Sequence, residues 1–201
     1  MIANAQHVFW SPGYGLMLVA GFIVGGVLWA KRMRGRPELT VALAGGIVGL
    51  VAGAKLGYLF AEGSLIWGSE TFWQQALVGK TVVGALLGGY VGVEIGKRLI
   101  GYRQATGDTF ALAVPAGLIF GRIGCLLHRC CRGVTCDAHW WAVADGRGGH
   151  YYPAAISELI FNVIALSVFV WMVRRRRQTG QLFHLYLIAY GLFRFVHEFV
   201  R

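Results

Sequence analysis

Six apolar stretches, each near the roughly 20 residues that a helix needs to cross a bilayer, dominate this sequence. Charged residues make up 14% of the chain, against roughly 25% in soluble domains, and apolar residues make up 56%. The stretches are residues 14–30, 41–60, 82–95 (with a start expected earlier, near Leu77), 109–127, 153–173 and 181–200. They are too long for barrel strands of about 10 residues. The sequence predicts an all-α, polytopic integral membrane helical bundle of about six transmembrane helices, as one domain over residues 1–201.

The net charge of +10 arises mainly from the connections between these stretches. Eleven of the 19 Lys and Arg residues lie in three connections on one side of a six-span bundle: Lys31, Arg32, Arg34, Arg36, Lys97, Arg98, Arg103, Arg174, Arg175, Arg176 and Arg177. The positive-inside rule makes that side cytoplasmic, so both termini are expected outside the cytoplasm. Cations placed between apolar runs do not form the soluble basic face of a nucleic-acid binder. The segment before the first span lacks Lys and Arg, so no cleavable signal peptide is expected.

Glycine recurs at every fourth position in two consecutive spans. The second span contains Gly45, Gly49, Gly53 and Gly57, and the third contains Gly84, Gly88, Gly92 and Gly96. A small residue at every fourth position lines one helix face and lets helix backbones approach closely. We expect these two helices to pack tightly. The alternative is a glycine-lined groove for an acyl chain or headgroup.

Six ionisable residues lie within the apolar stretches: Lys55, Arg122, Arg194, Glu94, Glu158 and Glu198. A charge at the centre of a bilayer helix costs about 2.5–3.5 kcal/mol on insertion scales, so these residues are expected to face the bundle interior. Buried ion pairs without chemistry are one interpretation. The other is an anion clamp, because Arg122 and Arg194 lie toward the outer ends of their spans and guanidinium groups match phosphate geometry. Phosphatidylglycerol or another anionic phospholipid is the expected partner.

Five motifs follow one another along nearly the whole chain. They are GYGLM at 13–17, AKLGY at 54–58, GRIG at 121–124, PAAISE at 153–158 and the stretch 187–198, which contains LIAYGLFR. In this order they resemble the prolipoprotein diacylglyceryl transferase family. The resemblance implies an enzyme of the bacterial cytoplasmic (inner) membrane. It would transfer a diacylglyceryl group from phosphatidylglycerol to the cysteine thiol of a lipobox-containing prolipoprotein and release glycerol phosphate, with no cofactor.

The chain departs from the family pattern at several positions. Val83 replaces the histidine of the family's His-Gly-Gly motif, Tyr152 replaces a histidine before Pro153, Cys125 replaces an asparagine, and Lys55 replaces an arginine. Because the chain ends at Arg201, we expect no seventh span. These differences leave the acceptor open. A relative that uses the same donor with a small thiol, amine or sugar is one alternative, and a noncatalytic lipid-binding membrane protein is another.

Candidate site residues follow from the charges and from the resemblance. Arg122 and Arg194 are expected to stabilise the phosphate leaving group. Glu198 is expected to hold Arg194 or to pair with another cation. Lys80 is a candidate base or phosphate ligand, and Glu158 is a candidate base or an ion-pair partner of Lys55 or of an arginine. Further residues are expected to line the substrate site: Tyr14, Lys55, Gly124, Glu158, Tyr190 and Arg201.

Four cysteines lie within twelve residues of one external connection: Cys125, Cys130, Cys131 and Cys136. Their spacing does not match a paired zinc motif, so no metal site is expected. Outside the cytoplasm disulfides are allowed, and a bridge from Cys130 or Cys131 to Cys136 is the simplest interpretation. Free buried thiols, a metal site and a thiol that takes part in lipid chemistry stay open as alternatives.

Overall fold

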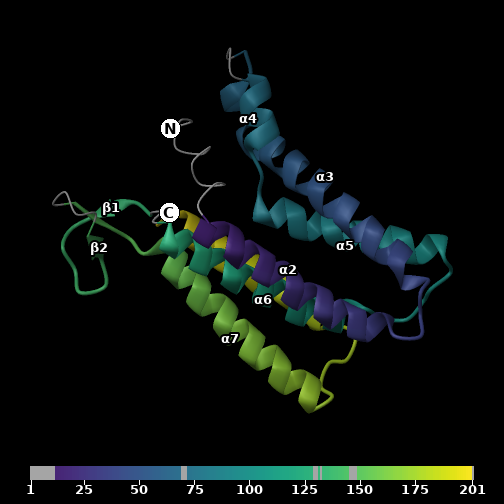
Figure 1. Cartoon of the computed structure of the whole chain (residues 1–201). Helices are drawn as coiled ribbons and strands as arrows, with labels where there is room; N and C mark the ends of the chain where they lie inside the picture. Colours follow the sequence, from purple (N-terminus) through teal and green to yellow (C-terminus); the bar gives the residue numbers. More distant parts are fainter. Residues whose placement is uncertain (1–11, 69–71, 129–130, 132, 145–148, 201) are drawn as a thin grey trace. The chain divides into compact units, whose positions relative to one another are not determined.

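The computed structural model describes residues 12–68, 72–128, 131, 133–144 and 149–200 (Figure 1). These residues form two compact units. The first unit comprises the described parts of Met1–Arg32 and Ala105–Arg201, and the second comprises those of Met33–Gln104. Each unit is described by itself.

The first unit is a bundle of four helices: α2 (Pro12–Met33), α6 (Gly107–Leu127), α7 (Ala154–Arg174) and α8 (Leu182–Glu198). Helix α6 packs against α7 and α8. Helix α2 contacts α6 where Gly21 faces the backbone of Gly117, and where the rings of Trp29 and Phe110 lie 4.8 Å apart. Figure 1 shows α2, α6 and α7 running alongside one another.

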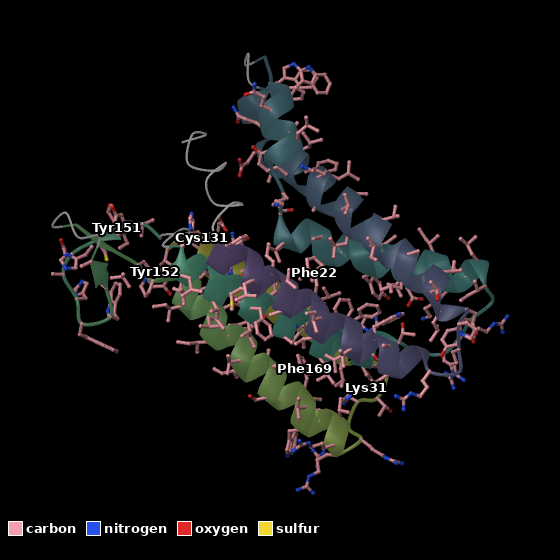
Figure 2. The ribbon with its side chains drawn as sticks, in the orientation of Figure 1. Phe22, Lys31, Cys131, Tyr151, Tyr152 and Phe169 are labelled. Atoms are coloured by element: carbon pink, nitrogen blue, oxygen red, sulfur yellow. The ribbon has the colours of Figure 1, made fainter. Side chains whose placement is uncertain are left out.

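The two ends of this bundle differ in chemistry. Figure 2 shows Cys131 and Tyr152 at one end, and Lys31 and Phe169 toward the other. The basic run that ends α7 follows Phe169, so it lies at the same end as Lys31. This is the distribution that the basic connections predict, with cations gathered at one end of the helices.

A small sheet covers the end of the bundle opposite the cations. Strands β1 (Thr135–Cys136), β2 (Val143–Ala144) and β3 (His150–Tyr151) pair antiparallel in the order β1-β3-β2. The preceding segment is tied to the helices, since Val134 N–H donates to the Val200 carbonyl at 3.2 Å. The all-α interpretation did not include these strands, because two-residue strands leave no alternating pattern in a sequence.

The second unit consists of α3 (Leu39–Ile66), α4 (Phe72–Val78) and α5 (Val82–Leu99). Its two long helices meet along the two glycine ladders, which confirms the expectation that they pack tightly. A Cβ added at Gly88 would lie 2.7 Å from Gly53 Cα, and one added at Gly96 would lie 2.8 Å from Ala42 Cα. Only glycine permits this approach, because the atoms that a Cβ would strike belong to the opposing backbone.

The third span begins later than the sequence indicated. The helix was expected to start near Leu77, but that residue belongs to the separate helix α4, and α5 begins at Val82. Thr81 has an extended backbone, and its side chain accepts a hydrogen bond from Gly84 N at 3.3 Å. This N-cap satisfies one of the donors left free at the start of α5 and fixes the boundary.

Four described helices are long and apolar enough to cross a membrane: α2, α3, α6 and α7. Helix α5 carries Glu94, Lys97 and Arg98 near its end, and α8 has 17 residues, so neither has that length and composition. The chain is therefore a helical multi-pass membrane protein, and six is an approximate number of spans.

Candidate functional site

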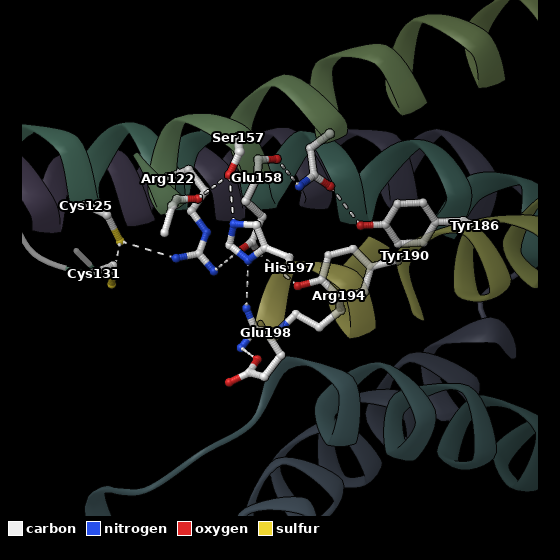
Figure 3. A network of polar contacts seen from close by, with 12 residues as sticks. Arg122, Cys125, Cys131, Ser157, Glu158, Tyr186, Tyr190, Arg194, His197 and Glu198 are labelled. Carbon is white, nitrogen blue, oxygen red and sulfur yellow. Dashed lines mark hydrogen bonds and ion pairs between the residues drawn. The ribbon is translucent and has the colours of Figure 1, made fainter. Parts of the chain in front are cut away.

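Three helix ends of the first unit meet at the end opposite the cations. Arg122 lies in the last two turns of α6, Glu158 in the first two turns of α7, and Arg194 in the last two turns of α8. Because α7 runs antiparallel to the other two helices, residues far apart in sequence come together here. Figure 3 shows the polar network that they form.

Glu158 is the buried centre of this network, with 1% of its surface exposed. Its Oε2 pairs with Arg122 NH2 at 2.6 Å, and its Oε1 accepts a hydrogen bond from the Tyr190 hydroxyl at 2.9 Å. The Arg122 side chain is itself only 12% exposed. A buried guanidinium needs such a partner, because an unpaired charge pays a large desolvation cost. The expected pairing of Glu158 with an arginine is confirmed, and the arginine is Arg122.

Arg194 is held by residues of its own helix. Its NH2 pairs with Glu198 Oε2 at 2.5 Å, and its NH1 lies 3.4 Å from His197 Nδ1. The expected pairing of Glu198 with Arg194 is therefore formed. On its other side the His197 ring reaches α7, where Nε2 lies 2.7 Å from Ser157 Oγ.

The two arginines share neighbours, although each has its own carboxylate. Glu158, the partner of Arg122, follows Ser157 in sequence, and Ser157 contacts His197, the neighbour of Arg194 (Figure 3). Each guanidinium has five N–H donors, and only some are used by the carboxylates. The remaining donors of the two groups suit a phosphate. The two arginines that the sequence singled out are brought together.

Tyr14 and Gly124 contact each other across the α2–α6 interface. A Cβ added at Gly124 would lie 2.9 Å from Cδ2 of the Tyr14 ring and 3.4 Å from Met17 Cβ. Gly124 thus makes room for the ring one turn before the C-terminal end of α6. Roles of Tyr14, Gly124 and Tyr190 in substrate binding stay predictions.

Lys55 and Lys80 belong to the second unit. Lys55 Nζ donates to three carbonyl oxygens at the C-terminal end of α4: those of Ala76 at 3.3 Å, Leu77, and Gly79 at 3.1 Å. These contacts use all three donors of an ammonium group, so they stabilise the turn between α4 and α5. Lys80 follows in that turn and is exposed. Roles of both lysines toward a substrate stay predictions.

Cys125 lies near Arg122, and Cys131 lies near Cys125. Cys125 Sγ is 4.0 Å from Arg122 NH1 and 3.6 Å from Cys131 Sγ. Among the described cysteines, Cys125, Cys131 and Cys136 form no disulfide, so the expected bridge from Cys131 to Cys136 is not formed. Cys130 lies outside the described residues, as does Arg201. Among the residues that the structure describes, no group of three or more His, Cys, Asp or Glu side chains could hold a metal ion.

Sequence reasoning missed Ser157 and His197. His197 is next to Glu198 in sequence but points away from it around the helix. The informative spacing is that from Arg194, three residues earlier, because residues three apart share a helix face. Tyr152, which stands where the resembled family has a histidine, contributes a ring 5.8 Å from that of His197.

Known proteins resemble the chain over nearly its whole length. A family model described as prolipoprotein diacylglyceryl transferase matches residues 7–201. The phosphatidylglycerol–prolipoprotein diacylglyceryl transferase of Chromohalobacter salexigens is 32% identical over 212 residues, which cover 100% of this chain and 78% of the relative. Proteins with the same name from Clostridium tetani (28% identical, 94% of this chain and 80% of the relative) and Vibrio vulnificus (29%, 98% and 79%) are also similar. The chain therefore belongs to the prolipoprotein diacylglyceryl transferase family.

Proposed function

We propose that this protein transfers the diacylglyceryl group of phosphatidylglycerol to a cysteine thiol of a prolipoprotein and releases glycerol phosphate. The relatives carry that activity in their names, at about 30% identity over most of the chain. The observation that carries the proposal is that the Arg122 and Arg194 guanidinium groups belong to one polar network where α6, α7 and α8 meet (Figure 3). Phosphatidylglycerol is bound through its phosphate, and the prolipoprotein supplies the lipobox cysteine.

The reaction needs charge stabilisation more than it needs a cofactor. The thiolate sulfur attacks the glyceryl carbon that carries the phosphate ester, the carbon–sulfur bond forms, and the carbon–oxygen bond breaks. The bonding electron pair leaves with the phosphate oxygen, so negative charge grows on glycerol phosphate. Arg122 and Arg194 stabilise that charge in a site of low dielectric constant, where fixed cations act most strongly.

Other residues have supporting roles. Glu158 and Glu198 are the counter-ions of the two guanidinium groups, and Tyr190 fixes Glu158 through its hydroxyl. Tyr14, packed on Gly124, lines the donor site from α2, and Arg201 binds the phosphate or the acceptor. The end of the first unit that carries Arg122, Glu158 and Arg194 faces the outside of the bacterial inner membrane, because the basic segments that follow α2 and α7 lie at the opposite end. Both termini are then extracytoplasmic.

The test is reconstitution of the purified protein into vesicles that contain labelled phosphatidylglycerol, with a lipobox peptide as acceptor. Release of glycerol phosphate that requires the peptide supports the proposal. Phosphatidylglycerol binding without release contradicts it and identifies a lipid-binding protein.

A different acceptor is the second candidate, favoured by Val83 at the position of the family histidine. A parallel reaction replaces the peptide by a small thiol, an amine or a sugar. Release that requires one of these compounds and does not occur with the peptide identifies a transferase with another acceptor.

A further inference from the structure

His197 belongs to the polar network, and the proposed reaction does not use it. The residue is buried, with 3% of its surface exposed. Its ring nitrogens contact Ser157 Oγ on α7 and Arg194 NH1 on α8, and its ring stacks on Phe193 at a centroid distance of 5.0 Å. The imidazole is therefore held on both edges and on one face, which fixes its orientation.

The contacts of this ring are compatible with one arrangement of protons. A guanidinium group can only donate, so His197 Nδ1 accepts from Arg194 NH1 and carries no proton. A neutral imidazole then carries its proton on Nε2, which donates to Ser157 Oγ at 2.7 Å. The single hydroxyl proton of Ser157 is directed to the Ala154 carbonyl at 3.0 Å. All three hydrogen bonds are satisfied together only in this arrangement.

This polarity excludes a serine nucleophile activated by a histidine base. In such a pair the hydroxyl donates to the imidazole, which can then remove its proton. Here the hydroxyl donates to the Ala154 carbonyl and the imidazole donates to the hydroxyl oxygen. The hydrogen bonds instead run in one direction, from Arg194 on α8 through His197 to Ser157 on α7. They end on a backbone carbonyl in the first turn of α7.

Arg194 is the group whose position depends on His197. Its other partner, Glu198, has a side chain that is 62% exposed. An exposed ion pair of this kind contributes about 0–1 kcal/mol, too little to hold a guanidinium in one orientation. The buried imidazole, itself fixed by Ser157, supplies the rigid contact.

We propose that Ser157 and His197 form a positioning relay, in which neutral His197, protonated on Nε2, orients the Arg194 guanidinium toward the phosphate of the lipid donor. The proposal rests on the proposed function for the identity of that donor. His197 is a positioning residue, since it acts through Arg194 and touches neither the donor nor the acceptor.

The proton arrangement is tested by nitrogen NMR on protein with ¹⁵N-labelled histidine in zwitterionic detergent micelles. The chain has six histidines, so the His197 signals are identified by their loss in His197→Asn. The expected result is one protonated nitrogen, Nε2, and one unprotonated nitrogen, Nδ1. An imidazolium ring, or a proton on Nδ1, would overturn the relay. This measurement needs no transfer activity.

The positioning role is tested by the affinity for short-chain phosphatidylglycerol in the same micelles. His197→Leu removes the acceptor for Arg194 NH1 and should weaken binding about 5- to 10-fold, the effect of losing one hydrogen bond to a charged group. His197→Asn places an amide oxygen close to the position of Nδ1 and should recover part of that loss. Ser157→Ala, which leaves the imidazole in place but frees its Nε2 edge, should give an intermediate loss.

His184→Leu is the control, because it removes another histidine of the same helix at an exposed position. Wild-type affinity in His197→Leu, or equal losses in the Leu and Asn variants, would overturn the positioning role. A wild-type protein that binds phosphatidylglycerol but transfers nothing would contradict the proposed function and leave the relay standing. The two failures are therefore distinguishable.

Discussion

The buried ion pair between Glu158 and Arg122 makes a quantitative prediction about stability. Glu158→Gln keeps the shape of the side chain and removes its charge. The Arg122 side chain, 12% exposed, then remains as a cation without a counter-ion in the interior of the first unit. Removing one member of a buried pair typically costs about 3–5 kcal/mol.

Part of this cost is recovered in the variant. The amide oxygen of glutamine can still accept the hydrogen bond from the Tyr190 hydroxyl, which is worth about 1 kcal/mol. We therefore expect a loss of about 2–4 kcal/mol in the free energy of unfolding. Glu198→Gln is the matched control, because it removes the carboxylate of the other arginine at a site that is 62% exposed. Its expected cost is about 0–1 kcal/mol.

The assay is unfolding of both variants in mixed micelles of increasing SDS content, followed by tryptophan fluorescence. The chain's 7 tryptophans provide the signal. A large difference between the two variants supports the assignment of Glu158 as the buried counter-ion. Equal stabilities of the two variants would refute it, because removing a buried carboxylate would then cost no more than removing an exposed one.

Three further perturbations test other contacts. Gly88→Ala should separate α3 from α5 and lower the free energy of unfolding by about 1–3 kcal/mol in the same assay. Gly89→Ala is the control and should be nearly neutral, because the nearest atom to its added Cβ lies at 3.6 Å. Equal effects of the two variants would contradict the ladder interface. Gly124→Ala should displace the Tyr14 ring and lower the free energy of unfolding by about 1–3 kcal/mol. Gly121→Ala is the control, because a Cβ added there meets nothing within 4 Å. An equal loss in both variants would argue against the contact between Tyr14 and Gly124. Lys55→Met should speed amide hydrogen exchange in the turn after α4 about 10-fold, because it removes the contacts of Lys55 with that turn. Unchanged exchange together with weaker binding of phosphatidylglycerol would instead assign the lysine to the substrate.

Much of the helical fold is readable from local patterns. The glycine ladders predict the α3–α5 contact because a face without side chains is stable only against another backbone. The intramembrane charges predict the meeting of Arg122, Glu158 and Arg194, since such groups are too costly to leave in lipid. Both inferences depend on features that are visible in the sequence: a glycine repeat in one case, and charged residues within apolar segments in the other.

Contacts that join distant segments leave no such signal. Lys55 caps a helix end that lies 21–24 residues further along the chain, whereas the sequence predicted a role at the substrate site or in an ion pair. The bond between Ser157 and His197 spans 40 residues and requires the relative rotation of α7 and α8. The spacing from Arg194 places His197 on the same helix face, but no local pattern indicates that Ser157 is its partner.

Transfer activity of Arg194→Ala is the most direct test of the central claim that the clustered guanidinium groups perform the chemistry. Arg194 is preferred to Arg122 because its partner Glu198 is exposed and tolerates the loss, so the variant should fold. Arg175→Ala, at the exposed end of α7, is the control for loss of a cation. In phosphatidylglycerol vesicles with the lipobox peptide, we expect Arg194→Ala to lower kcat about 10²- to 10³-fold, as for loss of one oxyanion donor, while the control keeps its rate. A folded Arg194→Ala protein that releases glycerol phosphate at the wild-type rate would contradict the account.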